Sequence, residues 1–239
     1  MEYTTEYALE EFKLHGEYQL LERLNRQLKI IFDVGCNIGE WSRMARSFNP
    51  IADIHMFDIG DKTFQKLLRN NVIDSRMFPN SFGLSSETKE IPLKYVLDND
   101  RVTTTALKIF HNEYVIKTGI VVNPMTYVTN QGIDCIDFLK IDVEGHELEV
   151  LKGFQPMLEA GKIRCISFEY GLACIPNRIF LMDYYEYLTP MGYILGKLTP
   201  EGVIFRDYAY WQEDFNGPDF VAVHATQANI IDTIKKGAD

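Results

Sequence analysis

The sequence predicts a doubly wound α/β fold, in which helices cover both faces of a mostly parallel sheet. Short apolar runs alternate with segments of helical periodicity over most of the chain. Polar loops that contain glycine or acidic residues follow several of these runs. Alternating strands and helices place the strands parallel and the helices on both faces. With 239 residues, 46% of them hydrophobic, the chain is long enough for one substantial core.

A helical stretch precedes the first strand. From Glu2 to Leu28 apolar residues recur at helical spacing, and Gly16 divides the stretch into two helices. Neither helix belongs to the alternation of strands and helices that follows. The sequence therefore predicts an N-terminal helical extension over residues 1–28 and one main domain over residues 29–239.

Five strands of the predicted sheet come next. The strands are expected at Ile30–Val34, Ile54–Phe57, Met77–Phe82, Phe138–Ile141 and Ile163–Phe168. The helices between and after them are expected at Gly39–Phe48, Lys62–Arg69, Leu148–Phe154 and Arg178–Leu188. The segment Glu90–Asn123 is rich in Thr, Val and Tyr, which predicts strands and loops that project from the edge of the sheet.

The pattern changes after Gly192. Three apolar runs are now joined by turns, one containing Pro200-Glu201-Gly202 and the other Asn216-Gly217-Pro218. The expected strands are Tyr193–Leu198, Val203–Tyr208 and Phe220–His224. Because strands joined by turns run antiparallel, the sheet is predicted to finish with an antiparallel C-terminal strand.

The composition disfavours several classes of protein. A formal charge of −10 opposes attraction to phosphate backbones, so nucleic acid is not expected as a partner. No apolar stretch reaches the roughly 20 residues that a membrane helix needs, and the acidic N-terminus is unlike a signal peptide. These features predict a cytoplasmic protein. The four cysteines form no Cys-x-x-Cys pair, so reduced thiols are expected.

The loop after the first predicted strand has the features of a nucleoside-binding loop. Asp33, Gly35, Asn37 and Gly39 lie between a buried strand and a helix. The glycines allow a sharp turn and a close approach of ligand to backbone. A carboxylate at Asp33 would repel a dinucleotide pyrophosphate but suits the ammonium and sulfonium groups of S-adenosylmethionine. The loop therefore predicts this cofactor, with S-adenosylhomocysteine as its product.

Two further positions are expected to hold the nucleoside. Asp58 ends the second predicted strand and lies about 25 residues beyond Asp33, near the offset of a ribose-binding acid. Its carboxylate can accept hydrogen bonds from both ribose hydroxyls. Ser85 follows the third strand, where adenine would lie if the ligand spans the edge of the sheet.

The end of the fourth predicted strand is the candidate reaction centre. Asp142 and Glu144 leave the sheet at the edge where ligands bind in doubly wound folds. Lys140 shares a strand face with Asp142 and is expected to pair with it. His146 is a candidate acid or base, and Glu169 ends the following strand at the same edge.

The chemistry at this edge leaves two routes open. Asp142, Glu144 or His146 could remove a proton directly, or a divalent metal held by Asp142, Glu144 and Glu169 could acidify a hydroxyl. The direct route is slightly favoured, because no spacing here forms a recognisable motif of oxygen ligands. Glu147 is expected in the first turn of the next helix, facing solvent.

Three stretches resemble the FkbM family of methyltransferases. The family signature is similar to the run Asp142-Val143-Glu144-Gly145-His146-Glu147, which lies within Phe138–Gly153. The family's donor-binding loop is similar to Asp33–Gly39, and its last strand is similar to Gly217–Val223. The resemblance covers most of the chain from Ile30 to His224. It implies a Rossmann-like class I methyltransferase fold and O-methylation of a sugar, a surface glycan or a small secondary metabolite. The N-terminal helices lie outside it, and we expect them to shape the acceptor site or to form a homo-oligomer contact.

Some positions depart from the family pattern, and two other functions stay open. Asp58-Ile59 stands where the family usually has Glu-Pro. Pro124–Tyr127 stands where the family often has Thr-Leu-Asp, and Ser85-Ser86 stands where it commonly has an acid.

An NAD-dependent oxidoreductase would need a third glycine in the first loop and no acid at Asp33. A catalytically silent donor-binding module would lack the acids near Asp142. The residues present favour a methyltransferase.

Overall fold

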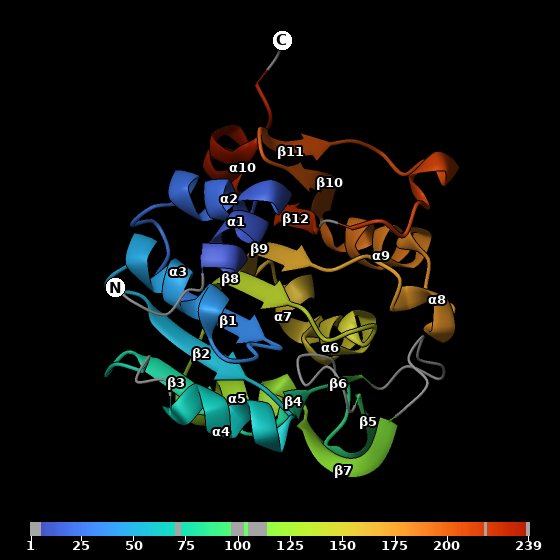
Figure 1. Ribbon diagram of the computed structural model, residues 1–239. Helices are drawn as coiled ribbons and strands as arrows, with labels where there is room; N and C mark the ends of the chain where they lie inside the picture. Colours follow the sequence, from blue (N-terminus) through green and yellow to red (C-terminus); the bar gives the residue numbers. More distant parts are fainter. Residues whose placement is uncertain (1–5, 70–72, 97–102, 105–113, 218, 238–239) are drawn as a thin grey trace.

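An eight-stranded sheet forms the centre of the computed structural model, which describes residues 6–69, 73–96, 103–104, 114–217 and 219–237 (Figure 1). The strand order is β11-β10-β12-β9-β8-β1-β2-β3. The bounds are β1 (Ile30–Val34), β2 (Asp53–Phe57), β3 (Met77–Asn80), β8 (Ile136–Ile141), β9 (Ile163–Phe168), β10 (Tyr193–Thr199), β11 (Gly202–Phe205) and β12 (Phe220–His224). Within this sheet the neighbouring strands β9, β8, β1, β2 and β3 are mutually parallel. In contrast, β12 is antiparallel to both of its neighbours, β9 and β10. The predicted parallel sheet with an antiparallel C-terminal strand is confirmed.

Helices cover both faces of the sheet, as the sequence predicts. One face packs against α2 (Glu17–Arg23), α3 (Glu40–Phe48), α4 (Asp61–Arg69) and α10 (Ala228–Ile234). The other face packs against α5 (Pro124–Gln131), α6 (Glu147–Gly153), α7 (Gln155–Glu159), α8 (Cys174–Asn177) and α9 (Leu181–Leu188). Successive residues of β12 alternate between these two cores: Val221 and Val223 belong to the first, and Phe220 and Ala222 to the second.

The N-terminal helices are packed into the first of these cores. Gly16 separates α1 (Glu6–His15) from α2 and adopts a left-handed backbone conformation with φ of 90°. Leu20, Leu21, Leu24 and Leu28 are buried in the same hydrophobic cluster as the sheet residues. The predicted break at Gly16 is therefore confirmed, and both helices share the core of the main domain.

A small second sheet projects beyond the β3 edge of the main sheet (Figure 1). Its strands are β4 (Gly83–Leu84), β5 (Lys89–Val96), β6 (Thr103–Thr104) and β7 (Tyr114–Val122), in the order β4-β7-β5-β6. The single strand predicted over Met77–Phe82 ends at Asn80, and the chain then enters this second sheet. Residues 97–102 and 105–113 of the predicted strand-and-loop segment lie outside the described residues.

Other element boundaries differ locally from the predictions. The helix expected from Arg178 begins at Leu181, because Arg178 adopts φ of 58° at the end of α8. The strand expected to run to Tyr208 ends at Phe205. Helix α5 was not predicted, although Asn123 caps it, Pro124 occupies its first turn and Gly132 ends it.

Two expectations from composition concern the cysteines and the membrane helices. The cysteines are free, with Cys36, Cys165 and Cys174 buried and Cys135 half-buried. No helix in the described part of the chain is both long enough and apolar enough to cross a bilayer.

Candidate functional site

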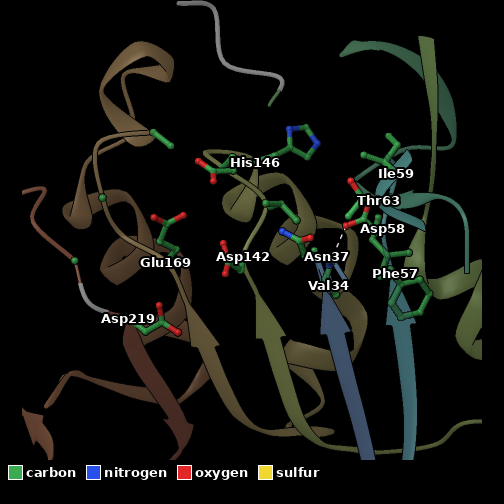
Figure 2. A pocket seen from close by; sticks show the side chains of 18 of the residues that line it. Val34, Asn37, Phe57, Asp58, Ile59, Thr63, Asp142, His146, Glu169 and Asp219 are labelled. Atoms are coloured by element: carbon green, nitrogen blue, oxygen red, sulfur yellow. Dashed lines mark hydrogen bonds between the residues drawn. The ribbon is translucent and has the colours of Figure 1, made fainter. Parts of the chain in front are cut away.

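A cavity of about 650 Å³ opens at the carboxyl edge of the parallel strands. Figure 2 shows Asn37, Asp58, Asp142, Glu169 and Asp219 arranged side by side above the ends of the strands. These side chains come from distant parts of the sequence. The cavity therefore joins the predicted nucleoside-binding loop to the predicted reaction centre.

The loop after β1 forms the floor at one end of the cavity. Gly35 lies against the residue that follows β8: a Cβ placed on it would be 1.7 Å from the carbonyl oxygen of Asp142. Asp58 stabilises the loop by accepting hydrogen bonds from the backbone N–H groups of Asn37, at 2.9 Å, and Gly60, at 2.7 Å. Burial raises the pKa of Asp58 to about 7. Predicted residues Gly35, Asn37 and Asp58 thus meet at one end of the cavity.

An apolar wall that the sequence did not reveal lies beside Asp58. It contains side chains from the end of β2 and from the second sheet: Phe57, Ile59, Leu84, Ile91, Leu93 and Val121. The second sheet could not be assigned to a binding site from its sequence alone, because its alternating pattern is equally typical of a solvent-facing hairpin.

The acidic edge after β8 lies at the middle of the cavity. Asp142, Glu144, His146 and Glu169 all line it. Burial, together with neighbouring Asp142, raises the pKa of Glu144 to about 7. Burial also raises the pKa of Glu169 well above its ordinary value, and the charge of Asp142 adds to this. The four predicted reaction-centre residues are thus brought together, as expected from their places on adjacent strands.

Glu147 holds the loop that carries these acids. Its carboxylate is fully buried and accepts hydrogen bonds from the backbone N–H groups of Val143, at 3.0 Å, and Gly145, at 3.1 Å. Asn177 donates to the carbonyl oxygen of Gly145 at 2.8 Å. The expectation of a solvent-facing Glu147 is therefore wrong, because the loop turns back over the first turn of α6.

The N-terminal helices and the start of β12 form the far wall. Glu11, Phe12, His15 and Glu17 line the cavity, as does Asp219. Asp219 accepts a hydrogen bond from the hydroxyl of Ser167 at 2.8 Å. Because β12 is antiparallel, its amino end meets the carboxyl ends of the parallel strands. Sequence reasoning missed these side chains, although it expected the N-terminal helices to shape an acceptor site.

Four residues predicted for the site do not line the cavity. Asp33 is fully buried within β1 and accepts a hydrogen bond from the hydroxyl of Ser42 at 2.6 Å, and burial raises its pKa to about 6. Gly39 adopts φ of 83° at the start of α3, where it packs against Leu67. Both positions lie behind the loop and outside the cavity lining, and their contact with a cofactor stays a prediction.

Lys140 and Ser85 also lie behind the cavity wall. Lys140 is buried and its ammonium lies 2.8 Å from a carboxylate oxygen of Asp142, which agrees with the predicted pairing. Burial lowers the pKa of Lys140, but nearby carboxylates, led by Asp142 and Glu17, outweigh it and hold that pKa well above its ordinary value. Ser85 is buried with its hydroxyl 3.0 Å from Nε2 of His146, so it can position that ring, and its contact with adenine stays a prediction.

The metal option for Asp142, Glu144 and Glu169 stays a prediction. The three carboxylates line one cavity. Within the part of the chain that the structure describes, however, no three side chains of His, Cys, Asp or Glu come together as ligands for a metal ion.

Known proteins are similar to this chain in sequence. The hexuronic acid methyltransferase AglP of Haloferax volcanii is 25% identical over 170 residues, which are 66% of this chain and 65% of that protein. The methyltransferase sdnD of Sordaria araneosa is 29% identical over 153 residues, which are 52% of this chain and 59% of that protein. The chain thus spans less than two thirds of the length of either relative.

Solved structures share the fold. A candidate rRNA methylase from Clostridium thermocellum superposes with a TM-score of 0.50 at 12% identity, covering 88% of this chain and 95% of that one. A candidate O-methyltransferase from Klebsiella pneumoniae also gives 0.50, at 10% identity, covering 92% and 82%. The fold is therefore that of class I methyltransferases. A model of the FkbM methyltransferase domain matches residues 33–177, which contain the loop after β1, Asp58 and the acidic edge, and the chain belongs to this family.

Proposed function

We propose that this protein is an S-adenosylmethionine-dependent O-methyltransferase acting on a hydroxyl of a sugar, a surface glycan or a small secondary metabolite. The observation that carries the proposal is the single cavity that joins Asp58 to the carboxylates of Asp142 and Glu144. Membership of the FkbM family supports methyl transfer. The printed name of AglP, a hexuronic acid methyltransferase, supports a sugar as one acceptor class.

The residues of the cavity fit the proposed donor. Asp58 keeps lone pairs for the ribose hydroxyls beyond the two backbone hydrogen bonds that it accepts. The side-chain oxygen of Asn37 is buried without a hydrogen-bond partner among the described residues, so it can accept from a ligand. The apolar wall beside Asp58 suits the face of an adenine ring, and the surrounding carboxylates suit cationic groups. A nicotinamide dinucleotide would instead bring its pyrophosphate against these carboxylates.

The acidic edge is placed to handle the proton of the acceptor. When bound, S-adenosylmethionine supplies an electrophilic methyl group on sulfur. Glu144, with its pKa raised to about 7, can accept the hydroxyl proton near neutral pH. Asp142, paired with Lys140, provides a fixed negative charge at the same edge. His146, held by Ser85, is a second base within the cavity.

Donor binding tests the assignment of the nucleoside end. Asp58→Ala is expected to weaken S-adenosylhomocysteine binding by roughly 1.5 to 3 kcal/mol, the range for a hydrogen bond to a charged group. Calorimetry of the wild type and the variant with S-adenosylmethionine, S-adenosylhomocysteine and NAD measures this loss. Asp61→Ala is a control on the exposed first turn of α4. Tight binding of NAD, or an unchanged dissociation constant in Asp58→Ala, would contradict the assignment.

Turnover tests the acidic edge separately from binding. Asp142→Asn and Glu144→Gln are expected to keep donor affinity within a few-fold while lowering turnover roughly a hundredfold or more, because a positioned acid or base acts on the reaction step. Measuring the wild type in EDTA, and then with magnesium or manganese restored, distinguishes direct proton removal from metal-assisted chemistry. If both variants keep full turnover, these acids are structural, and the base has to be sought at His146 or Glu169.

A further inference from the structure

The acceptor part of the cavity is lined by acidic side chains. Away from Asp58, its carboxylates are Glu11, Glu17, Asp142, Glu144, Glu169 and Asp219. No lysine or arginine among the described residues lines it, and its basic side chains there are His15 and His146. Lys140 lies behind the wall and pairs with Asp142 alone at salt-bridge distance. Acidic side chains in this wall therefore greatly outnumber basic ones.

Neighbouring carboxylates in this wall raise each other's pKa values. Burial raises the pKa of Glu17 well above its ordinary value, and Asp219 adds to the shift. Burial likewise raises the pKa of Asp219, and the charge of Asp142 acts in the same direction. An acceptor that brought a further carboxylate into this space would increase the repulsion, whereas an uncharged hydroxyl compound would not.

The rim of the same cavity is apolar. Leu172 lines the opening and is 59% exposed, and Phe215 lines it from the segment before β12. Phe180, 48% exposed, packs with its ring centroid 6.3 Å from that of Phe215. Ile175, 45% exposed, lies one helical turn beyond Leu172, and its backbone N–H donates to the carbonyl oxygen of Leu172. These four residues, the apolar rim, form a surface continuous with the acidic interior.

We propose that the acceptor is an uncharged hydroxyl compound that carries an apolar group, with its hydroxyl at the acidic edge and its apolar group on the rim. The proposal rests on the proposed methyltransferase function and adds to it the class of acceptor. An enzyme specific for uronates would bind a carboxylate in its acceptor site, whereas the acceptor proposed for this chain carries none. The interior selects by charge, and the rim selects by contact with apolar surface.

Matched glycosides test the two parts of the proposal. The probes are p-nitrophenyl β-D-glucopyranoside, p-nitrophenyl β-D-glucuronide and methyl β-D-glucopyranoside. Each is titrated by calorimetry into the full chain saturated with S-adenosylhomocysteine, near pH 8, in EDTA and again in magnesium. The p-nitrophenyl glucopyranoside is expected to bind at least tenfold more tightly than either of the others. Equal or tighter binding of the glucuronide, in either buffer, overturns the proposal, and so does failure of the p-nitrophenyl glucopyranoside to bind at millimolar concentration.

Variants assign each preference to its residues. The double variant Glu17→Gln, Asp219→Asn is expected to shift selectivity toward the glucuronide: the ratio of its affinity to that of the p-nitrophenyl glucopyranoside should rise at least several-fold. Leu172→Ser is expected to weaken binding of the p-nitrophenyl glucopyranoside several-fold with donor affinity unchanged. Ile51→Ser, which alters an exposed side chain outside the cavity, is the control and should change neither.

Two outcomes separate this proposal from the proposed function. Lack of S-adenosylhomocysteine binding to the wild type would overturn the function itself. Normal S-adenosylhomocysteine binding with unchanged glycoside preferences in both the double variant and Leu172→Ser would overturn the acceptor proposal alone.

Discussion

Gly35 shows how one residue sets both the contact between two strands and the shape of the cavity near Asp58. The amide of Asp142 donates to the carbonyl oxygen of Val34 at 2.9 Å, so the chain after β1 and the chain after β8 lie side by side. At φ of 87°, Gly35 turns the backbone away while its missing side chain leaves room for the Asp142 carbonyl. A substitution at Gly35 therefore affects the fold as well as the ligand.

Gly35→Ala is expected to lower the free energy of unfolding by more than about 4 kcal/mol, because the new Cβ meets backbone that cannot move aside without breaking the pairing of two strands. Gly132→Ala is the matched control. Gly132 also has a positive φ, of 65°, but a Cβ there would have no atom within 4 Å, so only the backbone strain of roughly 1 to 2 kcal/mol is expected. Urea denaturation measures both, and equal losses would rule out the steric explanation.

The raised pKa of Glu147 predicts how the stability of the protein changes with pH. Burial raises its pKa from 4.5 to about 7, so the folded state holds the proton more tightly than the unfolded state. Its contribution is fully present below pH 4.5 and is lost as pH rises through about 7. The wild type should therefore lose thermal stability between about pH 5 and pH 8 through this group.

Glu147→Gln keeps an acceptor for the amides of Val143 and Gly145 but removes the titration. It is expected to leave Tm nearly unchanged near pH 5 and to raise it by about 2 °C or more near pH 8. Glu22→Gln, at an exposed position on α2, is the control and should shift neither value. Calorimetric scans at both pH values test this, and an equal response of the two variants would show that burial of Glu147 is not the cause.

At the scale of elements, the N-terminal helices are part of both the core and the cavity wall. Helix α2 contributes Leu20 and Leu21 to the hydrophobic cluster beneath the sheet, and α1 presents Phe12 and His15 to the cavity. Their amphipathic pattern predicted helices correctly. It did not reveal the surface they cover, because periodicity identifies an apolar face without naming its partner.

Leu24→Ala is expected to destabilise the whole protein by about 2 to 5 kcal/mol, since Leu24 is fully buried in the core that the helices share with the sheet. Leu14→Ala, at a side chain that is 69% exposed, should cost little. Denaturation followed by both fluorescence and circular dichroism measures the loss. A separate early transition for the N-terminal helices in Leu24→Ala would instead support residues 1–28 as an independent extension.

At the scale of the molecule, the direction of the strands concentrates the acidic groups. The parallel strands β1, β2, β8 and β9 bring their carboxyl ends to one edge, and the antiparallel β12 brings its amino end there. Asp58, Asp142, Glu169 and Asp219 therefore converge although they are far apart in the sequence. A homo-oligomer through the N-terminal helices stays a prediction, which sedimentation of the full chain can test.

Much of the architecture follows from the sequence. The apolar run of β1, the helical periodicity of α3 and the turns before β11 and β12 predicted the α/β class and the antiparallel end. The acids at the ends of strands predicted the reaction edge, because parallel strands deliver their carboxyl ends to one place. These inferences depend on local spacing, which the sequence contains directly.

Only the tertiary structure decided which polar residues face the cavity and which lie behind it. Asp33 and Asp58 both lie near strand ends in polar motifs, yet Asp33 is covered by Ser42 of α3 whereas Asp58 lines the cavity. Glu17 and Asp219 were not predicted as site residues, and they reach the cavity through the packing of α2 and the reversed direction of β12. Spacing along a strand fixes the face of a side chain, but the elements packed against that face determine whether it meets a core or a cavity.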